Sequence, residues 1–142
     1  MNIAILGAGA WGTAFGIALA PRRAVKLWVR DPAQAAVMAA TRFNRRYLPD
    51  AALPPELAVT AELDMALAGA ELVIAGTPVS GLRPLAQMLH ARASAVPLIW
   101  LCKGFEEGTG LLPHQVMEAV YGAVLPPCGA LSGPSFAIEV AQ

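Results

Sequence analysis

Three glycines near the N-terminus have the spacing of a phosphate-binding turn. Gly7, Gly9 and Gly12 fit the pattern G-x-G-x-x-G, directly after an apolar run from Asn2 to Leu6. In such a turn the first glycine permits a tight reversal, the second lets the backbone approach a pyrophosphate, and the third lets a helix pack closely on the strand. The N–H groups at the start of that helix favour a negative charge. The pattern predicts a dinucleotide site; the alternative is a glycine-rich turn without a ligand.

The next residue that bears on ligand chemistry follows a second apolar run, Val25 to Val29. Folds that bind NAD place an Asp or Glu there, about 20 residues beyond the glycines, to hold the ribose hydroxyls. Here Arg30 occupies this place and Asp31 follows it. A guanidinium can pair with a 2′-phosphate and can lie along an adenine ring. Arg30 therefore favours NADP, while Asp31 leaves NAD open; the alternative for Arg30 is a solvated charge.

Polar residues also follow three later strands of the predicted sheet. Thr77 and Pro78 end one strand, Lys103 follows another, and the turn 132–135 (SGPS) follows the last. Ligands of open parallel sheets lie beyond the carboxyl ends of the strands. We expect Thr77 and Pro78 to border the cofactor, and Lys103 to meet a phosphate or carbonyl oxygen beside the nicotinamide. The alternatives are an ordinary strand-to-helix turn, a solvated lysine and simple N-capping by Ser135.

These residues require a framework of alternating strands and helices. The patterns predict strands at 2–6, 25–29, 57–60, 71–77, 97–102 and 128–131, and helices at 13–20, 33–41, 62–68, 81–93, 112–121 and 136–142. Residues 42–55, with three arginines and three prolines, are predicted to be an irregular surface loop. The alternation predicts one α/β domain over residues 1–142. We expect a doubly wound, Rossmann-like, mostly parallel sheet of about six strands with helices on both faces.

The composition fits a buried parallel sheet and argues against several partners. Hydrophobic residues make up 56% of the 142 residues and charged residues only 14%. Ten basic and ten acidic residues balance, so no net field attracts nucleic acid or an anionic membrane. No apolar stretch reaches the roughly 18 residues of a membrane-spanning helix. Cys102 and Cys128 fit no metal spacing, and we expect reduced thiols, a cytoplasmic location and no metal site.

Taken together, the motifs resemble the N-terminal cofactor-binding domain of bacterial-type NAD(P)-dependent glycerol-3-phosphate dehydrogenase. The resemblance is carried, in order along the whole chain, by GAGAWGTAFG, LWVRDP, NRRYLP, KGFEEGTG and LSGPSFAIEVA. The last two segments are more specific than the glycine motif. By this resemblance Lys103 matches a residue that touches both cofactor and substrate. Gly133 and Ser135 match substrate contacts, and the further cofactor contacts, with the motif glycines Gly7, Gly9 and Gly12, are Ala10, Trp11, Arg30 and Ala137.

The resemblance implies an oxidoreductase that interconverts dihydroxyacetone phosphate and sn-glycerol 3-phosphate with NADPH or NADH, feeding glycerophospholipid synthesis. It also implies a second, mostly helical domain that carries the general acid and base lysine. That domain is absent from these 142 residues. No catalytic residue is therefore assigned here, and we expect this half to be inactive alone. A homodimer is a further expectation.

Two departures from the family pattern and two other functions complete the predictions. Ala10 stands where the family often has serine, and Gly76 stands where a larger apolar residue is usual, which predicts slightly weaker packing. A 3-hydroxyacid or ketopantoate-type dehydrogenase is one alternative, against which the segments around Lys103 and Ser135 argue. A non-enzymatic module that binds NADP(H) is the other. His90 and His114 receive no catalytic role.

Overall fold

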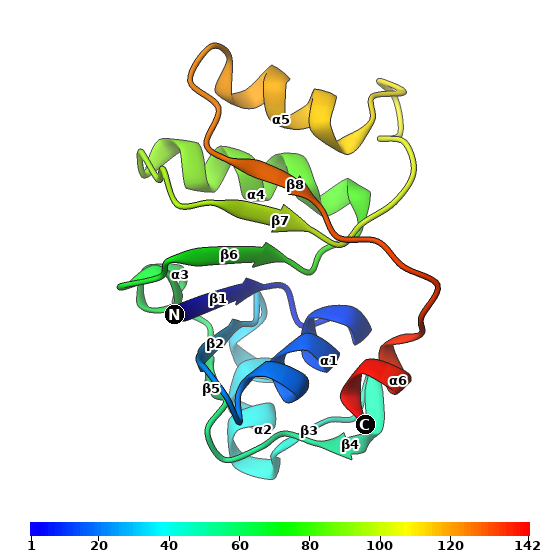
Figure 1. Cartoon of the computed structure of the whole chain (residues 1–142). Helices are drawn as coiled ribbons and strands as arrows, with labels where there is room; N and C mark the ends of the chain where they lie inside the picture. The colour runs from blue at the N-terminus through cyan, green and yellow to red at the C-terminus, as the bar shows by residue number, and fades with distance from the viewer.

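A parallel sheet of six strands forms the centre of the computed structural model, which describes residues 1–142 (Figure 1). The strand order is β5-β2-β1-β6-β7-β8, and every neighbouring pair is parallel. From β1 the chain moves outward to β2 and β5, returns to β6 beside β1, and continues to β7 and β8. This confirms the doubly wound sheet. The strands are β1 (Asn2–Leu6), β2 (Ala24–Trp28), β5 (Ala58–Thr60), β6 (Leu72–Ala75), β7 (Leu98–Trp100) and β8 (Cys128–Ala130).

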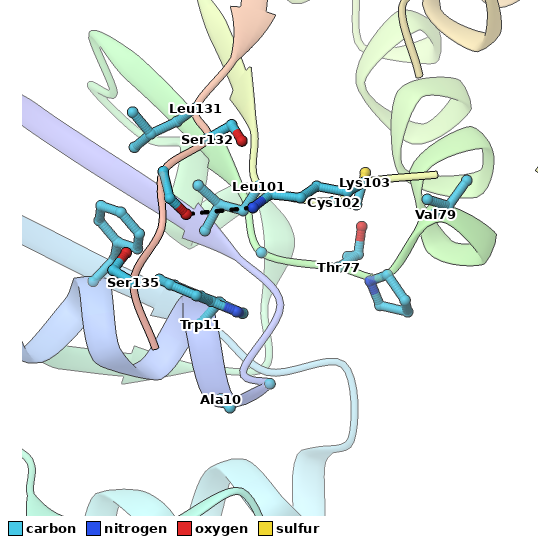
Figure 2. Close-up of a pocket in the computed structure, with 15 residues that line it drawn as sticks. Ala10, Trp11, Thr77, Val79, Leu101, Cys102, Lys103, Leu131, Ser132 and Ser135 are labelled. Carbon is cyan, nitrogen blue, oxygen red and sulfur yellow. Dashed lines mark hydrogen bonds between the residues drawn. The ribbon is translucent and has the colours of Figure 1, made fainter. Parts of the chain in front are cut away.

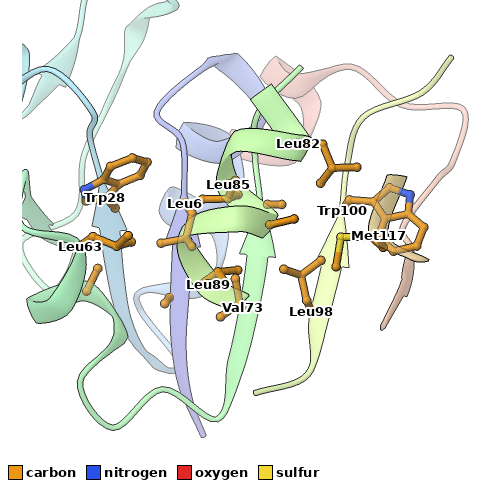
Figure 3. Packing of buried hydrophobic residues seen from close by; sticks show 14 of the residues in the cluster. Leu6, Trp28, Leu63, Val73, Leu82, Leu85, Leu89, Leu98, Trp100 and Met117 are labelled. Carbon is orange, nitrogen blue, oxygen red and sulfur yellow. The ribbon is translucent and has the colours of Figure 1, made fainter. Parts of the chain in front are cut away.

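Helices cover both faces of the sheet, and each face has its own apolar core. Along β1 alternate side chains point to opposite faces, so Ala4 and Leu6 belong to one core while Ile3 and Ile5 belong to the other. The first core packs on α3, α4 and α5 (Figure 3), and the second on α1 and α2. The helices are α1 (Ala10–Leu19), α2 (Pro32–Thr41), α3 (Leu63–Leu67), α4 (Val79–Ala91), α5 (Pro113–Tyr121) and α6 (Ala137–Ala141).

The first helix begins earlier than the sequence predicts. We expected it from Thr13, after the glycine motif, but α1 begins at Ala10 with Gly9 as its N-cap. Gly12 therefore lies in the first helical turn. Because glycine is a poor helix former in the interior of a helix, the sequence pattern placed the start of α1 after the motif. In the structure close packing on β1 allows the helix to begin within the motif. The other predicted strands and helices are present, with ends shifted by a few residues.

The prediction for residues 42–55 is wrong, because this segment is not an irregular loop. Strands β3 (Phe43–Asn44) and β4 (Leu48–Ala52) form a separate antiparallel pair. Arg42 ends α2 in the left-handed conformation, with φ of 60°. Its guanidinium donates hydrogen bonds to the carbonyl oxygens of Pro54 and Leu57. These bonds tie the start of the hairpin to the segment between β4 and β5. Helix α6 packs beside both β4 and α1 (Figure 1).

Gly76, at the end of β6, corrects a second prediction. We expected the missing side chain to weaken packing, but the structure leaves no room for one. A Cβ atom at Gly76 would lie 2.8 Å from the Cα of Gly12 and 2.9 Å from the carbonyl oxygen of Gly7. Gly12 is equally constrained, since its own Cβ would overlap that carbonyl oxygen. The backbones of β1, α1 and β6 therefore meet at three glycines.

We predict that Gly76→Ala destabilises the fold by about 1–3 kcal/mol, because the added methyl meets backbone that cannot move aside cheaply. Gly129→Ala is the matched control. Gly129 also lies in a strand of this sheet, but nothing lies within 4 Å of an added Cβ. Its stability should stay within about 1 kcal/mol of the wild type. Urea unfolding of both variants checks this, and equal stabilities would contradict the three-glycine contact.

Candidate functional site

The carboxyl ends of four strands open onto one pocket of about 540 Å³ (Figure 2). It lies where the strand order reverses between β1 and β6, the place at which open α/β sheets bind ligands. Four segments form its walls: the glycine loop with the start of α1, and the segments after β6, β7 and β8. The lining residues are Gly9, Ala10, Trp11, Phe15, Gly76, Thr77, Pro78, Val79, Leu101, Cys102, Lys103, Leu131, Ser132, Gly133 and Ser135.

The glycine loop leaves space for a ligand at one position. Gly7 has a φ of 113°, which a residue with a side chain adopts only with strain, and Gly12 touches the carbonyl oxygen of Gly7. Gly9 has an ordinary extended backbone, and a Cβ there would meet only the carbonyl oxygen of Gly76 at 3.7 Å. The fold therefore requires glycine at two positions of the motif. At Gly9, which lines the pocket, the missing side chain leaves room for a bound group.

The start of α1 presents a positive end to this pocket. The backbone N–H groups of Ala10, Trp11 and Gly12 have no hydrogen-bond acceptor, and the N-cap Gly9 has no side chain to supply one. No acidic residue lies in the first turn. Such a helix end binds anions through its free N–H groups and its dipole. The loop and helix therefore fit a phosphate or pyrophosphate group.

Thr77 places an unpaired hydroxyl in the opposite wall. Its Oγ1 atom is buried and has no hydrogen-bond partner. A buried hydroxyl without a partner costs about 1–3 kcal/mol. Thr77 and Pro78 both line the pocket, as the sequence predicts, and their contact with a ligand stays a prediction.

Lys103 carries the one charged side chain of the pocket lining. Its ammonium Nζ lies 3.5 Å from the carbonyl oxygen of Gly133, across the pocket from β7 to the segment after β8 (Figure 2). None of the three ion pairs of the structure includes Lys103. An exposed ammonium without a carboxylate partner can pair with a phosphate or a carbonyl oxygen of a ligand.

Glu106 anchors the loop that begins with Lys103, a role that the sequence analysis did not assign. Its carboxylate accepts two hydrogen bonds of 2.8 Å from Arg83 on α4 and one of 2.5 Å from Thr109. Only 28% of the Arg83 side chain and 11% of the Glu106 side chain are exposed. The hydrogen bond from Arg83, and then that from Thr109, lower the pKa of Glu106 to about 2. The same pairing raises the pKa of Arg83. The acidic residue of the KG-x-E segment thus fixes the loop to α4.

The structure separates the predicted site residues into two groups. Gly9, Ala10, Trp11, Lys103, Gly133 and Ser135 line the pocket, whereas Gly7, Gly12, Arg30 and Ala137 do not. Gly7 and Gly12 shape the loop from behind. Arg30 is exposed beyond the end of β2, and the adjacent Asp31 caps α2 by accepting a 3.0 Å hydrogen bond from the N–H of Ala33. Ala137 begins α6, which packs on α1.

The sequence analysis also missed Asn44, which lies in the segment predicted as a loop. Its side chain is 1% exposed and hydrogen bonds to the glycine loop and to α1. The segment NRRYLP, which contains Asn44, entered the sequence analysis only through the family resemblance.

His90 and His114, which received no catalytic role, are both exposed and outside the pocket. No group of three or more metal-ligating side chains is present, and none of the helices has the length and apolar character to cross a membrane.

Comparison with known proteins places these features in a family. The family model described as the N-terminus of NAD-dependent glycerol-3-phosphate dehydrogenase matches residues 2–142. Two curated relatives, both glycerol-3-phosphate dehydrogenase (NAD(P)+), are 53% identical (Methylibium petroleiphilum) and 56% identical (Paucimonas lemoignei) over the whole chain. The chain spans 43% of the length of each. A crystal structure of glycerol-3-phosphate dehydrogenase from Coxiella burnetii matches 99% of the chain with a TM-score of 0.88 and 33% identity, over 43% of its own length.

The pair of Arg83 and Glu106 predicts a specific loss of stability in acid. The folded-state pKa of Glu106 lies at about 2, below the ordinary value of 4.5. Its stabilising effect is therefore complete above pH 4.5 and is lost as the pH falls from there toward about 2. The difference in Tm between the wild type and Glu106→Gln should stay constant in neutral solution and shrink across that range.

Asp64→Asn is the matched control for this measurement. It breaks the pair of Asp64 with Arg92, whose side chains are 79% and 38% exposed. Solvent screening makes such a pair weak, so its effect on Tm should be small at every pH. A Tm difference for Glu106→Gln that does not change between pH 4.5 and 2 would show that the ion pair does not hold the loop.

Proposed function

The chain belongs to the NAD-dependent glycerol-3-phosphate dehydrogenase family, and we propose that it forms the dinucleotide-binding part of such an enzyme. The observation that carries the proposal is the pocket at the reversal of strand order. In that pocket Gly9, whose position the fold does not require to be glycine, lies beside the free N–H groups of α1, and Lys103 belongs to the same lining. No acidic side chain lines the pocket, and its one charged side chain is the ammonium of Lys103, so the pocket suits the negative charge of a pyrophosphate.

In this proposal different parts of the cofactor meet different walls. The pyrophosphate binds the N–H groups of Ala10 and Trp11 above the glycine loop, which Gly7, Gly9 and Gly12 shape. The nicotinamide side lies toward Thr77 and Lys103, at the ends of β6 and β7. The adenosine extends past the end of β2 toward Arg30, and Ala137 at the start of α6 completes the cofactor contacts. When bound, the nicotinamide supplies the hydride.

NADP is the cofactor that Arg30 favours, and NAD stays an accepted alternative. Arg30 has no ion-pair partner among the three pairs of the structure, so its guanidinium is free to pair with a 2′-phosphate. The carboxylate of Asp31 caps α2 through one oxygen. Its other oxygen makes no hydrogen bond within the protein and can accept one from a ribose hydroxyl.

We further propose that the complete enzyme interconverts dihydroxyacetone phosphate and sn-glycerol 3-phosphate, a step that feeds glycerophospholipid synthesis. Hydride transfer to a ketone requires a polarised carbonyl and a proton for the resulting alkoxide. Lys103 supplies positive charge beside the substrate, and Gly133 and Ser135 contact it from the segment after β8. The residue that donates the proton is not assigned to this chain. Oxidation of NADPH by dihydroxyacetone phosphate, measured on the complete enzyme, tests the reaction.

Two further properties belong to this proposal. A cytoplasmic location follows the sequence prediction, because the chain has only two cysteines, Cys102 and Cys128, and both are free thiols. A homodimer rests on the family resemblance alone. Light scattering of the complete enzyme at several concentrations tests the dimer, and a monomer at every concentration would rule it out.

Gly9→Ala should weaken binding of NADPH and NADH about tenfold or more, because its methyl group enters the space reserved for the pyrophosphate. The fold should stay intact, since no protein atom lies closer than 3.7 Å to that Cβ. Isothermal titration of the chain measures the affinity, and urea unfolding measures the stability. Gly129→Ala again serves as the control. Unchanged affinity in folded Gly9→Ala would contradict the proposed place of the pyrophosphate.

Arg30→Ala should weaken NADPH about tenfold or more while it leaves NADH within a few-fold, because only NADPH offers a 2′-phosphate to the guanidinium. Arg22→Ala is the matched control. Arg22 is another exposed arginine next to β2, but it precedes the strand, at the end of the sheet away from the pocket. Equal losses of both cofactors in Arg30→Ala would remove the argument for the 2′-phosphate.

A further inference from the structure

Asn44 is one of only two polar residues in the fully buried interior, and the other is Thr13. The Nδ2 group of Asn44 donates a hydrogen bond of 2.8 Å to the Oγ1 atom of Thr13. Neither lines the pocket. A buried amide persists where its hydrogen bonds are satisfied, so its partners indicate what it does.

The amide of Asn44 bridges the two ends of the glycine turn. Its Nδ2 group has two hydrogens and makes two bonds: one to Thr13, in the first turn of α1, and one of 2.8 Å to the carbonyl oxygen of Ala8. Ala8 lies between Gly7 and Gly9. Within the turn, the N–H of Thr13 donates to the carbonyl oxygen of Gly9 at 3.0 Å. The amide thus holds the loop before the helix and the helix itself at a fixed distance.

The bond to Ala8 bears on the direction of the neighbouring peptide groups. A peptide unit is planar, so a fixed carbonyl of Ala8 also fixes the N–H of Gly9, which points the other way. Because Gly9 has no Cβ, its dihedral angles have few steric limits, so the peptide group between Ala8 and Gly9 could otherwise adopt several orientations. The amide removes this freedom before any ligand arrives.

A second element gives Asn44 a rigid base. Asn44 pairs with Leu48 across the β3–β4 hairpin, and the N–H of Tyr47 donates to the carbonyl oxygen of Asn44 at 3.3 Å. At the base of the hairpin, the N–H of Leu53 donates to the carbonyl oxygen of Arg42 at 2.8 Å. Leu48 and Leu53 are buried. The position of the amide is therefore set by packing and backbone pairing outside the glycine loop.

We propose that Asn44 is a positioning residue for the dinucleotide pyrophosphate. From the β3–β4 hairpin it holds the glycine loop and the start of α1 in the conformation that directs their N–H groups at the ligand. The inference rests on the proposed function, because it assigns the support of that same site. It predicts that loss of the amide weakens binding of the pyrophosphate group and leaves binding of the adenosine group near Arg30 unchanged.

Two fragments of the cofactor separate these effects on the 142-residue chain. ADP-ribose contains the pyrophosphate, whereas 2′-AMP contains adenosine and a 2′-phosphate but no pyrophosphate. Asn44→Ala should lower the affinity for ADP-ribose about tenfold or more and the affinity for 2′-AMP less than about twofold, as measured by NMR titration. Asn44→Asp keeps the shape but replaces the donor by an acceptor. It should weaken ADP-ribose further, because a carboxylate would face the carbonyl oxygen of Ala8.

Leu89→Ala is the control for stability alone. Leu89 lies in the core on the other face of the sheet, and its truncation should lower the free energy of unfolding without changing the affinity of the folded chain for either fragment. Wild-type affinity for ADP-ribose in Asn44→Ala would overturn the proposal. Equal losses of affinity for ADP-ribose and 2′-AMP would overturn it too, since they would indicate a general distortion of the binding site.

Thr13→Val keeps the test decisive if Asn44→Ala does not fold. Valine matches the shape of threonine but leaves one hydrogen of the Asn44 amide without an acceptor, so ADP-ribose should bind several-fold more weakly and 2′-AMP as in the wild type. Equal binding of ADP-ribose to Thr13→Val and the wild type would overturn the inference. A folded wild-type chain that binds neither fragment would contradict the proposed function itself, and the inference with it.

Discussion

The close approach of three backbones at Gly7, Gly12 and Gly76 is the constraint on which the site depends. It brings α1 against β1 and β6 so closely that no Cβ atom fits at Gly12 or Gly76. As a result the start of α1 lies directly at the reversal of strand order, with its N–H groups free. The glycines therefore act first through packing, and the pocket for a negative group follows from that packing.

The remaining features of the site hold polar groups in place around that helix end. Glu106 ties the segment that begins with Lys103 to α4, and Asn44 ties the glycine loop to a hairpin. Both supporting side chains lie outside the pocket lining. The groups proposed to touch the ligand are thus oriented by a layer of hydrogen bonds behind them, which limits the rearrangement that binding would require.

Most of the fold could be predicted from local patterns, and the errors have physical causes. Apolar runs and turn residues located all six strands of the sheet. The β3–β4 hairpin was not predicted, because its prolines and arginines indicate a loop. It is held in place by tertiary hydrogen bonds of Asn44 and Arg42, which no local pattern reveals. The prediction for Gly76 was wrong because its close backbone contacts are with Gly7 and Gly12, which the sequence around Gly76 does not reveal. The pocket residues after the strands were predictable, since parallel strand ends converge, whereas the partner of Glu106 lies 23 residues away.

The most direct test of the account is a titration of the 142-residue chain with NADPH and with NADH, followed by tryptophan fluorescence. Trp11 lines the pocket, while Trp28 and Trp100 are buried in the core, so a ligand at the glycine loop should change the emission of Trp11. The account predicts saturable binding of both cofactors, with the tighter binding for NADPH. A folded chain whose fluorescence and calorimetric titrations show no binding of either cofactor would contradict it.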